Sequence, residues 1–548
     1  MADVPAPSSS SAFSFRLTPP PDPSSPRFGP RLGHARLTRP DGSPDLTIDT
    51  PALLTTTSRG VVPHLSRDHH RAADAVHWVN IPFETFLEQV PPVPTLQGGA
   101  HPLHTFLGFP PARNTLVMAL RDPACARELP PNGNDHVAAL TLRGVRKVSS
   151  SDWRAYVAAC NPDLVVALSD TPYTPPPHSQ KRLTKSLARS AAWLADLLRP
   201  FPPPPNSASP ATTATTTAGT HPLNVLVHMA GGPSAPARAA FAESLLEPLY
   251  GPDAALVAPL PTLDAGVAGY TFDLVPLRTA EPPAPIADLL RASLAPLPPT
   301  KLRLVNSPAS PHEILRLVRD VGVDVFDAAW AQDAASVGVA LDFVFPVPAS
   351  EAEKGEKGEL GHNLYDDKYA MDFARLADAL LAGSDSTPTS TPDTQPTCPC
   401  AACSPRAPAT HIAHSALDHL SFPSPSPTSA PAAQEQTHLP PLTRAYLHHL
   451  LHTHEMSAHA LLALHNLAVL DAFFAGIRAV LSDGPGREGF EGEVGRFAGR
   501  YDEGMGVFER ARGMWRGVDR ARGKGRLARE RDAQAGAGEV PADETALS

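Results

Sequence analysis

The chain has 548 residues, with 46 basic and 56 acidic side chains and a net charge of −10 at neutral pH. This balance excludes a basic field over the whole molecule, so that any contact with nucleic acid has to come from a local patch. The 65 prolines are more than twice the average usage of about 5%, and proline cannot join a helix interior or a central strand. We therefore expect an ordered part of about 400 residues, enough for one barrel domain with insertions.

Composition divides the chain into structured stretches and low-complexity segments rich in Ser, Pro, Ala and Thr, which bury too little apolar surface to fold. The predicted parts, in chain order, are a disordered segment (1–40), an α/β barrel (41–383) with a low-complexity insert (201–221), a zinc-binding part that completes the barrel (384–484) with a flexible insert (404–440), a helical, basic segment (485–533) and a disordered tail (534–548).

Short apolar runs alternate with amphipathic helical patterns through the barrel part. Six runs are predicted to be buried strands: Thr115–Leu120, Leu164–Leu168, Val225–Met229, Gly266–Tyr270, Lys301–Val305 and Val323–Phe326. Four helices are predicted between them: Lys181–Leu198, Ala235–Leu249, Ile286–Leu294 and Pro311–Val321. Buried strands separated by helices favour a parallel sheet covered on both faces. With about eight such units, a closed TIM-like (β/α)8 barrel is favoured over an open sheet.

The most apolar window, Ala458–Gly476, contains His465 and Asp471. Such residues favour a buried helix over a membrane span. At the start of the chain, Met1–Ser11 has no basic stretch followed by an apolar one, which is the pattern of a secretory signal. We expect no integral membrane segment and a cytoplasmic protein.

Three of the five cysteines lie in one short motif, Cys398-Pro399-Cys400-Ala401-Ala402-Cys403. The C-x-C-x-x-C spacing can place three thiolates around one ion, and zinc prefers four tetrahedral N or S ligands, a closed set that is structural. The motif therefore predicts one structural Zn²⁺ per chain. The pattern does not choose the fourth ligand among the histidines that follow, which are His448, His449, His452, His454, His459 and His465. The separate Cys125 and Cys160 are predicted to be ordinary thiols.

The sequence after this motif resembles the C-terminal signature of the tRNA-guanine transglycosylase family. The similar segments are Thr443–Leu451 (TRAYLHHLL), Glu455-Met456 and Leu461–Leu467 (LLALHNL). In the family the histidine of the His-Asn-Leu triplet closes the zinc site, which implies Cys398, Cys400, Cys403 and His465 as the four ligands. The insert at 404–440 departs from the family, but the entropy of closing a loop grows only logarithmically with its length. With gaps, the resemblance spans Leu46 to Gly484.

The residues that carry the family's catalysis are only partly present. Gly322–Asp327 resembles the motif of the nucleophilic aspartate, which places Asp327 at the attacking position. The arginine-bearing segment that follows it in catalytic members is Ala328–Ser336 here, and the base-binding Gln-Gly-Gly is Ala230-Gly231-Gly232. The Asp-Ser-Gly-Gly segment with the second aspartate is absent from the sequence. These losses resemble the family's non-catalytic members, so we expect Asp327 to be inactive and no residue to be catalytic.

Three N-terminal segments also resemble these non-catalytic members: Asp49–Leu54, Arg59–Leu65 and Leu142–Lys147. The resemblance implies a heterodimer with a catalytic queuine tRNA-ribosyltransferase subunit, which exchanges the wobble guanine for queuine in tRNAs with G-U-N anticodons. It also implies peripheral association with the mitochondrial outer membrane. Contacts to the tRNA are expected from the basic C-terminal segment, at Arg512, Arg516, Arg520, Arg522 and Lys524.

Two other functions are compatible with the sequence. The first is an active transglycosylase with a redesigned pocket and Asp327 as nucleophile, which would exchange bases as a purified chain. The second is a zinc-stabilised scaffold without an RNA role, whose proline-rich inserts act as docking segments. Affinity for tRNA separates this scaffold from the accessory subunit.

Overall fold

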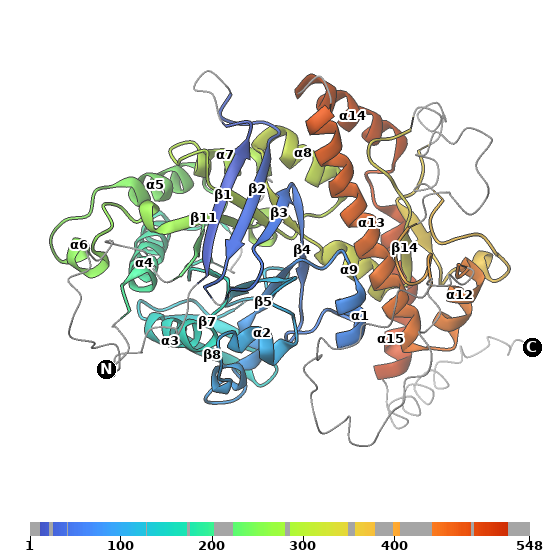
Figure 1. The fold of residues 1–548 in the computed structure, drawn as a ribbon, viewed down its shortest axis with the longest axis horizontal. Coiled ribbons are helices and arrows are strands. Elements are labelled where there is room, and N and C mark those ends of the chain that lie inside the picture. Colours follow the sequence, from blue (N-terminus) through green and yellow to red (C-terminus); the bar gives the residue numbers. More distant parts are fainter. Residues whose placement is uncertain are drawn as a thin grey trace, which may run out of the picture.

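The computed structural model contains the whole chain, and its fold is shown in Figure 1. It describes residues 11–523 except for 21–25, 41, 126, 128, 173–175, 202–222, 280–284, 349–356, 379–397, 406–440 and 484–486. The inserts predicted at 201–221 and 404–440 therefore lie almost entirely outside the described residues. The predicted tail at 534–548 and Lys524 lie outside them as well.

Eight parallel strands close into a barrel, as predicted. Around the barrel they follow the order β10-β11-β12-β13-β4-β5-β6-β9. Their bounds are β4 Ala52–Thr56, β5 Trp78–Pro82, β6 Thr115–Ala119, β9 Leu164–Val166, β10 Val225–His228, β11 Val267–Asp273, β12 Leu302–Asn306 and β13 Val325–Asp327. Six of them coincide with the predicted strands, whereas β4 and β5 were not predicted.

Helices cover the outside of the barrel and connect successive strands. The predicted helices are present as α4 Gln180–Leu198, α5 Ala235–Leu246, α7 Ile286–Leu294 and α8 Pro311–Val321. Each of α4, α5 and α8 begins at a serine whose hydroxyl accepts a hydrogen bond from a backbone N–H of the first turn, the usual way to satisfy the free donors of a helix start. The connection from β6 to β9 contains a hairpin, β7 His136–Thr141 and β8 Gly144–Ser149, and then α3 Ser150–Cys160.

The segment predicted to be disordered, 1–40, instead contains two strands. β1 Ala12–Thr18 and β2 Leu32–Thr38 form an antiparallel sheet with β3 Leu46–Thr50, which lies across the barrel in Figure 1. Phe13 and Phe15 pack on the apolar residues inside the barrel, with the ring of Phe13 6.1 Å from that of Trp78. The buried Arg39 pairs with Asp163 at 2.9 Å. Apolar side chains at alternate positions and this buried ion pair outweigh the proline-rich composition.

The C-terminal part packs against one side of the barrel. It contains the hairpin of β14 Val339–Leu341 and β15 Gly361–Asn363, and then α12 Arg444–His452, α13 Met456–Asp483, α14 Arg487–Arg500 and α15 Gly506–Gly523. The long α13 contacts α9 Ala329–Ser336, β14 and β4, so that it joins the C-terminal part to the barrel (Figure 1). The segment predicted to be helical at 485–533 corresponds to α14 and α15 in its described residues.

Helix α13 is long and apolar enough to cross a membrane, but its most apolar stretch is 67% buried inside the protein. Phe473 and Phe474 pack in the core, and Gly476 allows the helix to approach the loop between β14 and β15 so closely that an added Cβ would overlap the carbonyl of Phe345. The helix is therefore placed as the core helix of a folded domain, as expected from its polar residues.

Candidate functional site

The three cysteines of the C-x-C-x-x-C motif and His465 meet in one buried cluster. His465 Nδ1 lies 3.7 Å from the sulfur of Cys398 and 3.5 Å from those of Cys400 and Cys403. In a tetrahedral zinc site, bonds of about 2.3 Å to sulfur and about 2.0 Å to nitrogen place these atoms about 3.5 Å apart. The four side chains therefore fit one zinc ion, and none of them is more than 8% exposed.

Of the histidines that the sequence pattern left as candidates for the fourth ligand, His465 is the one that lies against the three sulfurs. Its Nε2 donates a hydrogen bond to the carbonyl of Leu341 at 2.9 Å, which leaves the lone pair of Nδ1 facing the three sulfurs. Metal-binding histidines are usually oriented by such a bond to the other ring nitrogen. The next residue, Asn466, accepts from the Leu341 N–H and donates to the carbonyls of Ala331 and Val339. The cluster is thereby attached to both α9 and β14.

The close packing of the thiols shifts the pKa values of two of them in opposite directions. Hydrogen bonds from Cys398 and Cys403 lower the pKa of the Cys400 thiol, whereas hydrogen bonding to Cys398 and Cys400 and burial raise the pKa of Cys403. Three adjacent buried sulfurs cannot all ionise without a positive charge between them. A divalent cation supplies that charge and is bound by thiolates, so the arrangement favours a metal centre over three free thiols.

Helix α12 holds the cysteine loop in place from the other side. The N–H of Leu442, just before the helix, donates to the carbonyl of Ala402 at 2.8 Å. At the helix start, Arg444 pairs with Asp378 at 2.8 Å and Asp372 at 3.3 Å, and it contacts His362 at 2.9 Å. Arginine forms several directed hydrogen bonds at once, so this residue fixes α12 on the segment that follows β15.

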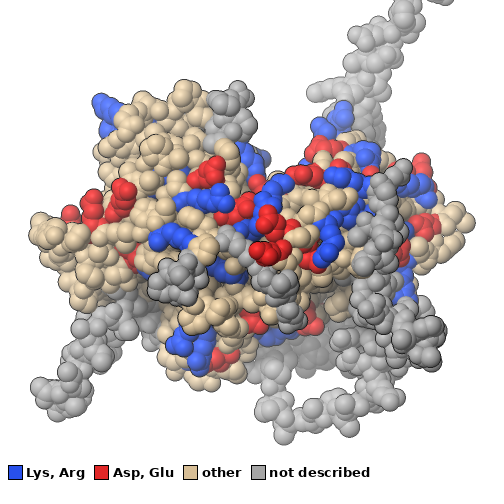
Figure 2. Space-filling view, turned by 90° about the horizontal axis from the view of Figure 1, so that it is seen from above, with Lys and Arg blue, Asp and Glu red and all other residues tan. Residues whose placement is uncertain are grey.

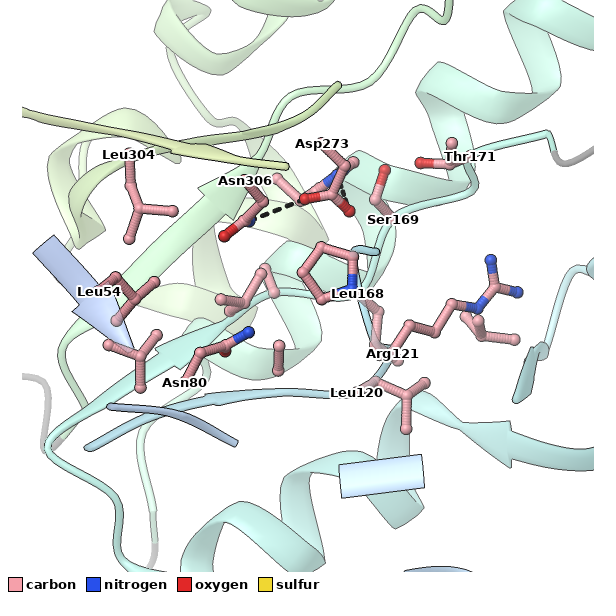
Figure 3. A pocket seen from close by; sticks show the side chains of 17 residues that line it. Leu54, Asn80, Leu120, Arg121, Leu168, Ser169, Thr171, Asp273, Leu304 and Asn306 are labelled. Carbon is pink, nitrogen blue, oxygen red and sulfur yellow. Dashed lines mark hydrogen bonds and ion pairs between the residues drawn. The ribbon is translucent and has the colours of Figure 1, made fainter. Parts of the chain in front are cut away.

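A second candidate site is the mouth of the barrel, at the carboxyl ends of the strands, where function is located in this fold. A cavity of about 50 Å³ lies there, whereas pockets for small ligands have roughly 300–1,000 Å³. Figure 3 shows its mixed lining of apolar and polar side chains. The polar ones are Asn80, Arg121, Ser169, Thr171, His228, Asp273 and Asn306. The cavity is too small for a nucleotide.

Asp273 is the charged centre of this mouth. His228 Nε2 lies 3.0 Å from one carboxylate oxygen, and the Asn306 amide donates to the other at 2.9 Å (Figure 3). Burial alone would raise the pKa of Asp273, but His228 and Asn306 outweigh it and hold the pKa below its ordinary value. Asp273 is therefore an ionised carboxylate that is already paired with its neighbours.

Asp327, at the family's nucleophile position, is turned into the protein. It is 0% exposed, and it does not line the cavity. Its two oxygens accept hydrogen bonds from the N–H groups of Ser307 at 2.7 Å and Ala329 at 3.2 Å. Burial raises its pKa to about 7, and the nearby charges of Asp273 and Asp122 contribute in the same direction. A buried carboxyl with both oxygens engaged is badly placed for attack on a sugar carbon.

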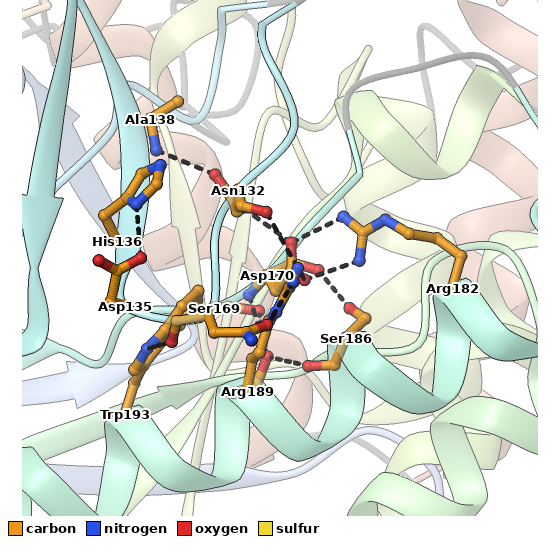
Figure 4. A network of polar contacts seen from close by, with 12 residues as sticks. Asn132, Asp135, His136, Ala138, Ser169, Asp170, Arg182, Ser186, Arg189 and Trp193 are labelled. Atoms are coloured by element: carbon orange, nitrogen blue, oxygen red, sulfur yellow. Dashed lines mark hydrogen bonds and ion pairs between the residues drawn. The ribbon is translucent and has the colours of Figure 1, made fainter.

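One wall of the mouth is fixed by an ionic network around Asp170, shown in Figure 4. The buried carboxylate accepts hydrogen bonds from both guanidinium nitrogens of Arg182 at 2.7 Å, and from Arg189 at 2.9 Å and Asn132 at 2.8 Å. Burial raises the pKa of Asp170, but these partners outweigh it and lower the pKa overall. The network attaches the start of α4 to the loop before β7, and it restricts the opening of this wall.

Sequence reasoning missed the polar residues of the mouth. Asp273 and Asn306 end β11 and β12, and Asp122 follows β6, with a pKa that burial raises. The signal was available, because a polar residue at the carboxyl end of a barrel strand is the usual position of a site residue. The turn after β10 contains Ala230-Gly231-Gly232, where the family resemblance implies a glutamine. A Cβ at Gly231 would lie 2.7 Å from the backbone nitrogen of Arg238, whose side chain bonds the carbonyl of Gly232.

Four of the five predicted tRNA contacts lie on α15, and the fifth, Lys524, lies outside the described residues. Arg512, Arg516 and Arg520, named the arginine row below, are exposed and spaced by four residues, so that they share one face of the helix. Their side chains are held along this face, because Arg516 Nε donates a hydrogen bond to the backbone carbonyl of Arg512, and Arg520 Nε donates one to that of Arg516. Arg522 is also in α15, but its side chain is outside the described part. In Figure 2, basic and acidic side chains are interspersed on the face shown.

Comparisons with known proteins identify the family. Residues 28–416 and 436–492 match the family model of queuine tRNA-ribosyltransferase. A protein of Schizosaccharomyces pombe, named queuine tRNA-ribosyltransferase accessory subunit 2, is 25% identical over 83% of this chain and 79% of its own length. Proteins with the same name are 25% identical in Drosophila yakuba, over 82% and 85%, and 26% identical in Caenorhabditis elegans, over 41% and 44%. The chain belongs to the queuine tRNA-ribosyltransferase family.

Proposed function

We propose that this member of the family is the non-catalytic subunit of a heterodimeric queuine tRNA-ribosyltransferase. Its catalytic partner exchanges the wobble guanine for queuine in tRNAs with G-U-N anticodons, and this chain completes the complex and helps to hold the tRNA. The observation that carries the proposal is the contrast between two sites. Asp327 is buried and bonded through both oxygens beside a small cavity, whereas three cysteines and His465 lie close enough together to hold one metal ion.

The zinc ion has a structural role in this proposal. Cys398, Cys400, Cys403 and His465 form a closed set of four ligands, with no position for a water or a substrate. When bound, the ion supplies the positive charge that the clustered thiolates require. It thereby connects the cysteine loop to α13, which packs on the barrel through α9 and β4.

The surface beside this centre is a suitable place for the partner. Met371 and Phe373 are 77% and 69% exposed, and Tyr446 on α12 is 45% exposed. They lie on adjacent segments, because the N–H of Ala445 donates to the carbonyl of Asp372 at 2.7 Å. Exposed apolar and aromatic side chains that cluster in this way are typical of protein interfaces. The metal centre would hold both segments of this interface in position.

The contact with tRNA is proposed for the arginine row on α15. Arginines on one helix face can pair with successive phosphates, and recognition of folded RNA depends mainly on shape and phosphates. Glu509 pairs with Arg512 at 3.0 Å, so the row is partly neutralised in the free protein. A tRNA phosphate would compete with this exposed ion pair, which contributes little to stability.

The decisive experiment is reconstitution with the catalytic homologue that co-purifies with the tagged chain. We expect guanine exchange by the complex, none by this chain alone, and a close to unchanged rate with Asp327→Ala in this chain. Substitution of the partner's nucleophile should abolish exchange. Incorporation of labelled queuine by the isolated chain, stopped by Asp327→Ala, would instead make this chain an active transglycosylase.

The interface is tested separately with Phe373→Glu. A buried charge without a partner weakens an interface strongly, so this variant should lose co-purification while its zinc content stays the same. Leu142→Glu is the matched control, because Leu142 is 75% exposed on the hairpin of β7 and β8. If both variants bind the partner as well as the unmodified chain does, the interface lies elsewhere. A complex without affinity for tRNA would favour the scaffold function.

A further inference from the structure

A second group of potential metal ligands lies on α12, separate from the cysteine cluster. It consists of His448 and His452 on the helix and Asp367 in the short helix η5 Asp367–Tyr369. One ligand atom from each of the three lies within 4.8 Å of the others. His448 is buried, whereas His452 and Asp367 are exposed, so the group opens to solvent at the surface of the C-terminal part.

The two histidines are oriented in the way that metal ligands are. Nδ1 of His448 donates to the carbonyl of Leu364 at 3.0 Å, and Nε2 of His452 donates to the carbonyl of Tyr365 at 3.1 Å. Each bond requires the proton on the nitrogen that makes it, so the other ring nitrogen keeps its lone pair. Metal-binding histidines typically donate their second N–H to a carbonyl in this manner. A spacing of four residues places both rings on the same side of α12.

The remaining contacts hold the rings in this arrangement without using their free nitrogens. Tyr365 stacks on His452 with ring centroids 4.2 Å apart and an angle of 4° between the planes. The ring centroids of His448 and His452 are also 4.2 Å apart. The adjacent Asp366 caps η5 by accepting from the Lys368 N–H at 3.2 Å. Among the described residues, no hydrogen bond or ion pair occupies the carboxylate of Asp367, which is left for an ion.

We propose that Asp367, His448 and His452 form a second metal site, which binds a divalent first-row transition metal such as Zn²⁺. Two imidazoles and one carboxylate suit such ions, and a site with three protein ligands leaves one or more positions for water. Because it is open to solvent and lacks thiolates, this site exchanges its ion readily, whereas the closed cysteine site holds its zinc.

Occupancy of the second site would connect α12 to the segment Leu364–Asp367. Helix α12 also carries Tyr446, which belongs to the proposed partner surface, and it leads through Leu442 to the cysteine loop. An exchangeable ion here would therefore stiffen the surface next to the structural zinc. This effect concerns the binding of a metal by this chain alone, so it holds whether or not the chain has a catalytic partner.

The site is tested by calorimetric titration of the full chain, without a histidine tag and with one zinc already bound, using zinc chloride alone. We expect one additional ion to bind to the unmodified chain. His452→Ala and Asp367→Asn, both at exposed positions, should each weaken this second event by at least about tenfold. His449→Ala is the control, because His449 is exposed on the same helix but outside the group.

The absence of a second binding event in the unmodified chain would overturn the proposal. An equal loss in His449→Ala and His452→Ala would also overturn it, because the ion would then bind surface histidines without a defined site. Cys400→Ser separates this proposal from that of the structural zinc. The variant should lose the tightly bound ion and should still bind zinc at Asp367, His448 and His452.

Discussion

Replacement of Asp327 by asparagine should change the pH dependence of stability. Burial raises the pKa of this carboxyl from an ordinary value of 3.8 to about 7. In the unfolded chain the proton is lost near pH 4, whereas the folded chain retains it until about pH 7. The folded state therefore binds more protons between these values, and the free energy of unfolding falls as the pH rises. Above pH 7 the contribution is constant.

The size of the effect follows from the two pKa values. Each pH unit between 3.8 and about 7 corresponds to about 1.4 kcal/mol, so that ionisation of Asp327 costs the folded state about 4 kcal/mol at pH 8. The asparagine side chain of the variant would not ionise, although it presents an amide to one of the two N–H donors. We expect the difference in unfolding free energy between Asp327→Asn and the unmodified chain to shift in favour of the variant by about 4 kcal/mol from pH 4 to pH 8.

Urea denaturation at intervals of one pH unit measures this difference, and the comparison cancels the titration of all other groups. The control is Asp253→Asn, at an exposed carboxylate in the first turn of α6 Gly251–Val257. A difference that stays constant with pH would refute the reasoning, because Asp327 would then be as ionised in the folded chain as in the unfolded one.

Three further outcomes are expected. Cys400→Ser should lower the zinc content below one ion per chain and reduce the melting temperature by several degrees, whereas Cys125→Ser should change neither; full zinc occupancy in Cys400→Ser would exclude the proposed site. Gly476→Ala should lower the free energy of unfolding by about 1–3 kcal/mol, because its Cβ would overlap the backbone of the loop between β14 and β15. Gly492→Ala, in an open position of α14, should raise it by about 0.5–1 kcal/mol. Chemical denaturation measures both changes. Alanine at all three positions of the arginine row should weaken tRNA binding by the complex and make it less dependent on salt, whereas Arg496→Ala on α14 should not.

The barrel could be predicted where the sequence carries continuous apolar runs. Strands β6, β9, β10, β11, β12 and β13 are such runs and are buried on both faces. Strands β4 and β5 were missed because their apolar pattern is interrupted. Thr55 and Asn80 interrupt their apolar pattern, and the burial of these polar side chains is decided by the closed barrel, which no local pattern contains.

The N-terminal sheet was missed for a different reason. The run Ala12–Thr18 has Phe13, Phe15 and Leu17 at alternate positions, which is the period of a half-buried strand. The prolines on both sides dominated the composition and masked this signal. Composition averages over a long window, whereas a strand of seven residues depends on the order of its side chains. The alternating pattern is therefore the better predictor of a short strand.

The two sites differ in how completely they could be predicted from the sequence. The cluster of three cysteines and His465 was predictable because the cysteines lie within six residues and the histidine belongs to a motif that resembles a family signature. The mouth of the barrel depends on Asp122, Asp273 and Asp327, which come from the ends of three different strands. Only closure of the barrel brings their charges close enough to affect one another. Whether a carboxylate faces a cavity or the protein interior is likewise decided by backbone donors such as the N–H of Ser307.

The two sites also tolerate change differently, which supports the proposal that this chain lost catalytic residues and kept a metal site. Substitutions at the mouth alter a solvent-facing end of the barrel, and the strands beneath it remain packed. His465, by contrast, belongs to the metal cluster and also bonds to β14, and the adjacent Asn466 bonds to β14 and α9. Loss of the metal centre would therefore disturb the contact between α13 and the barrel itself. A subunit that needs its shape but not its chemistry can dispense with the first site and must retain the second.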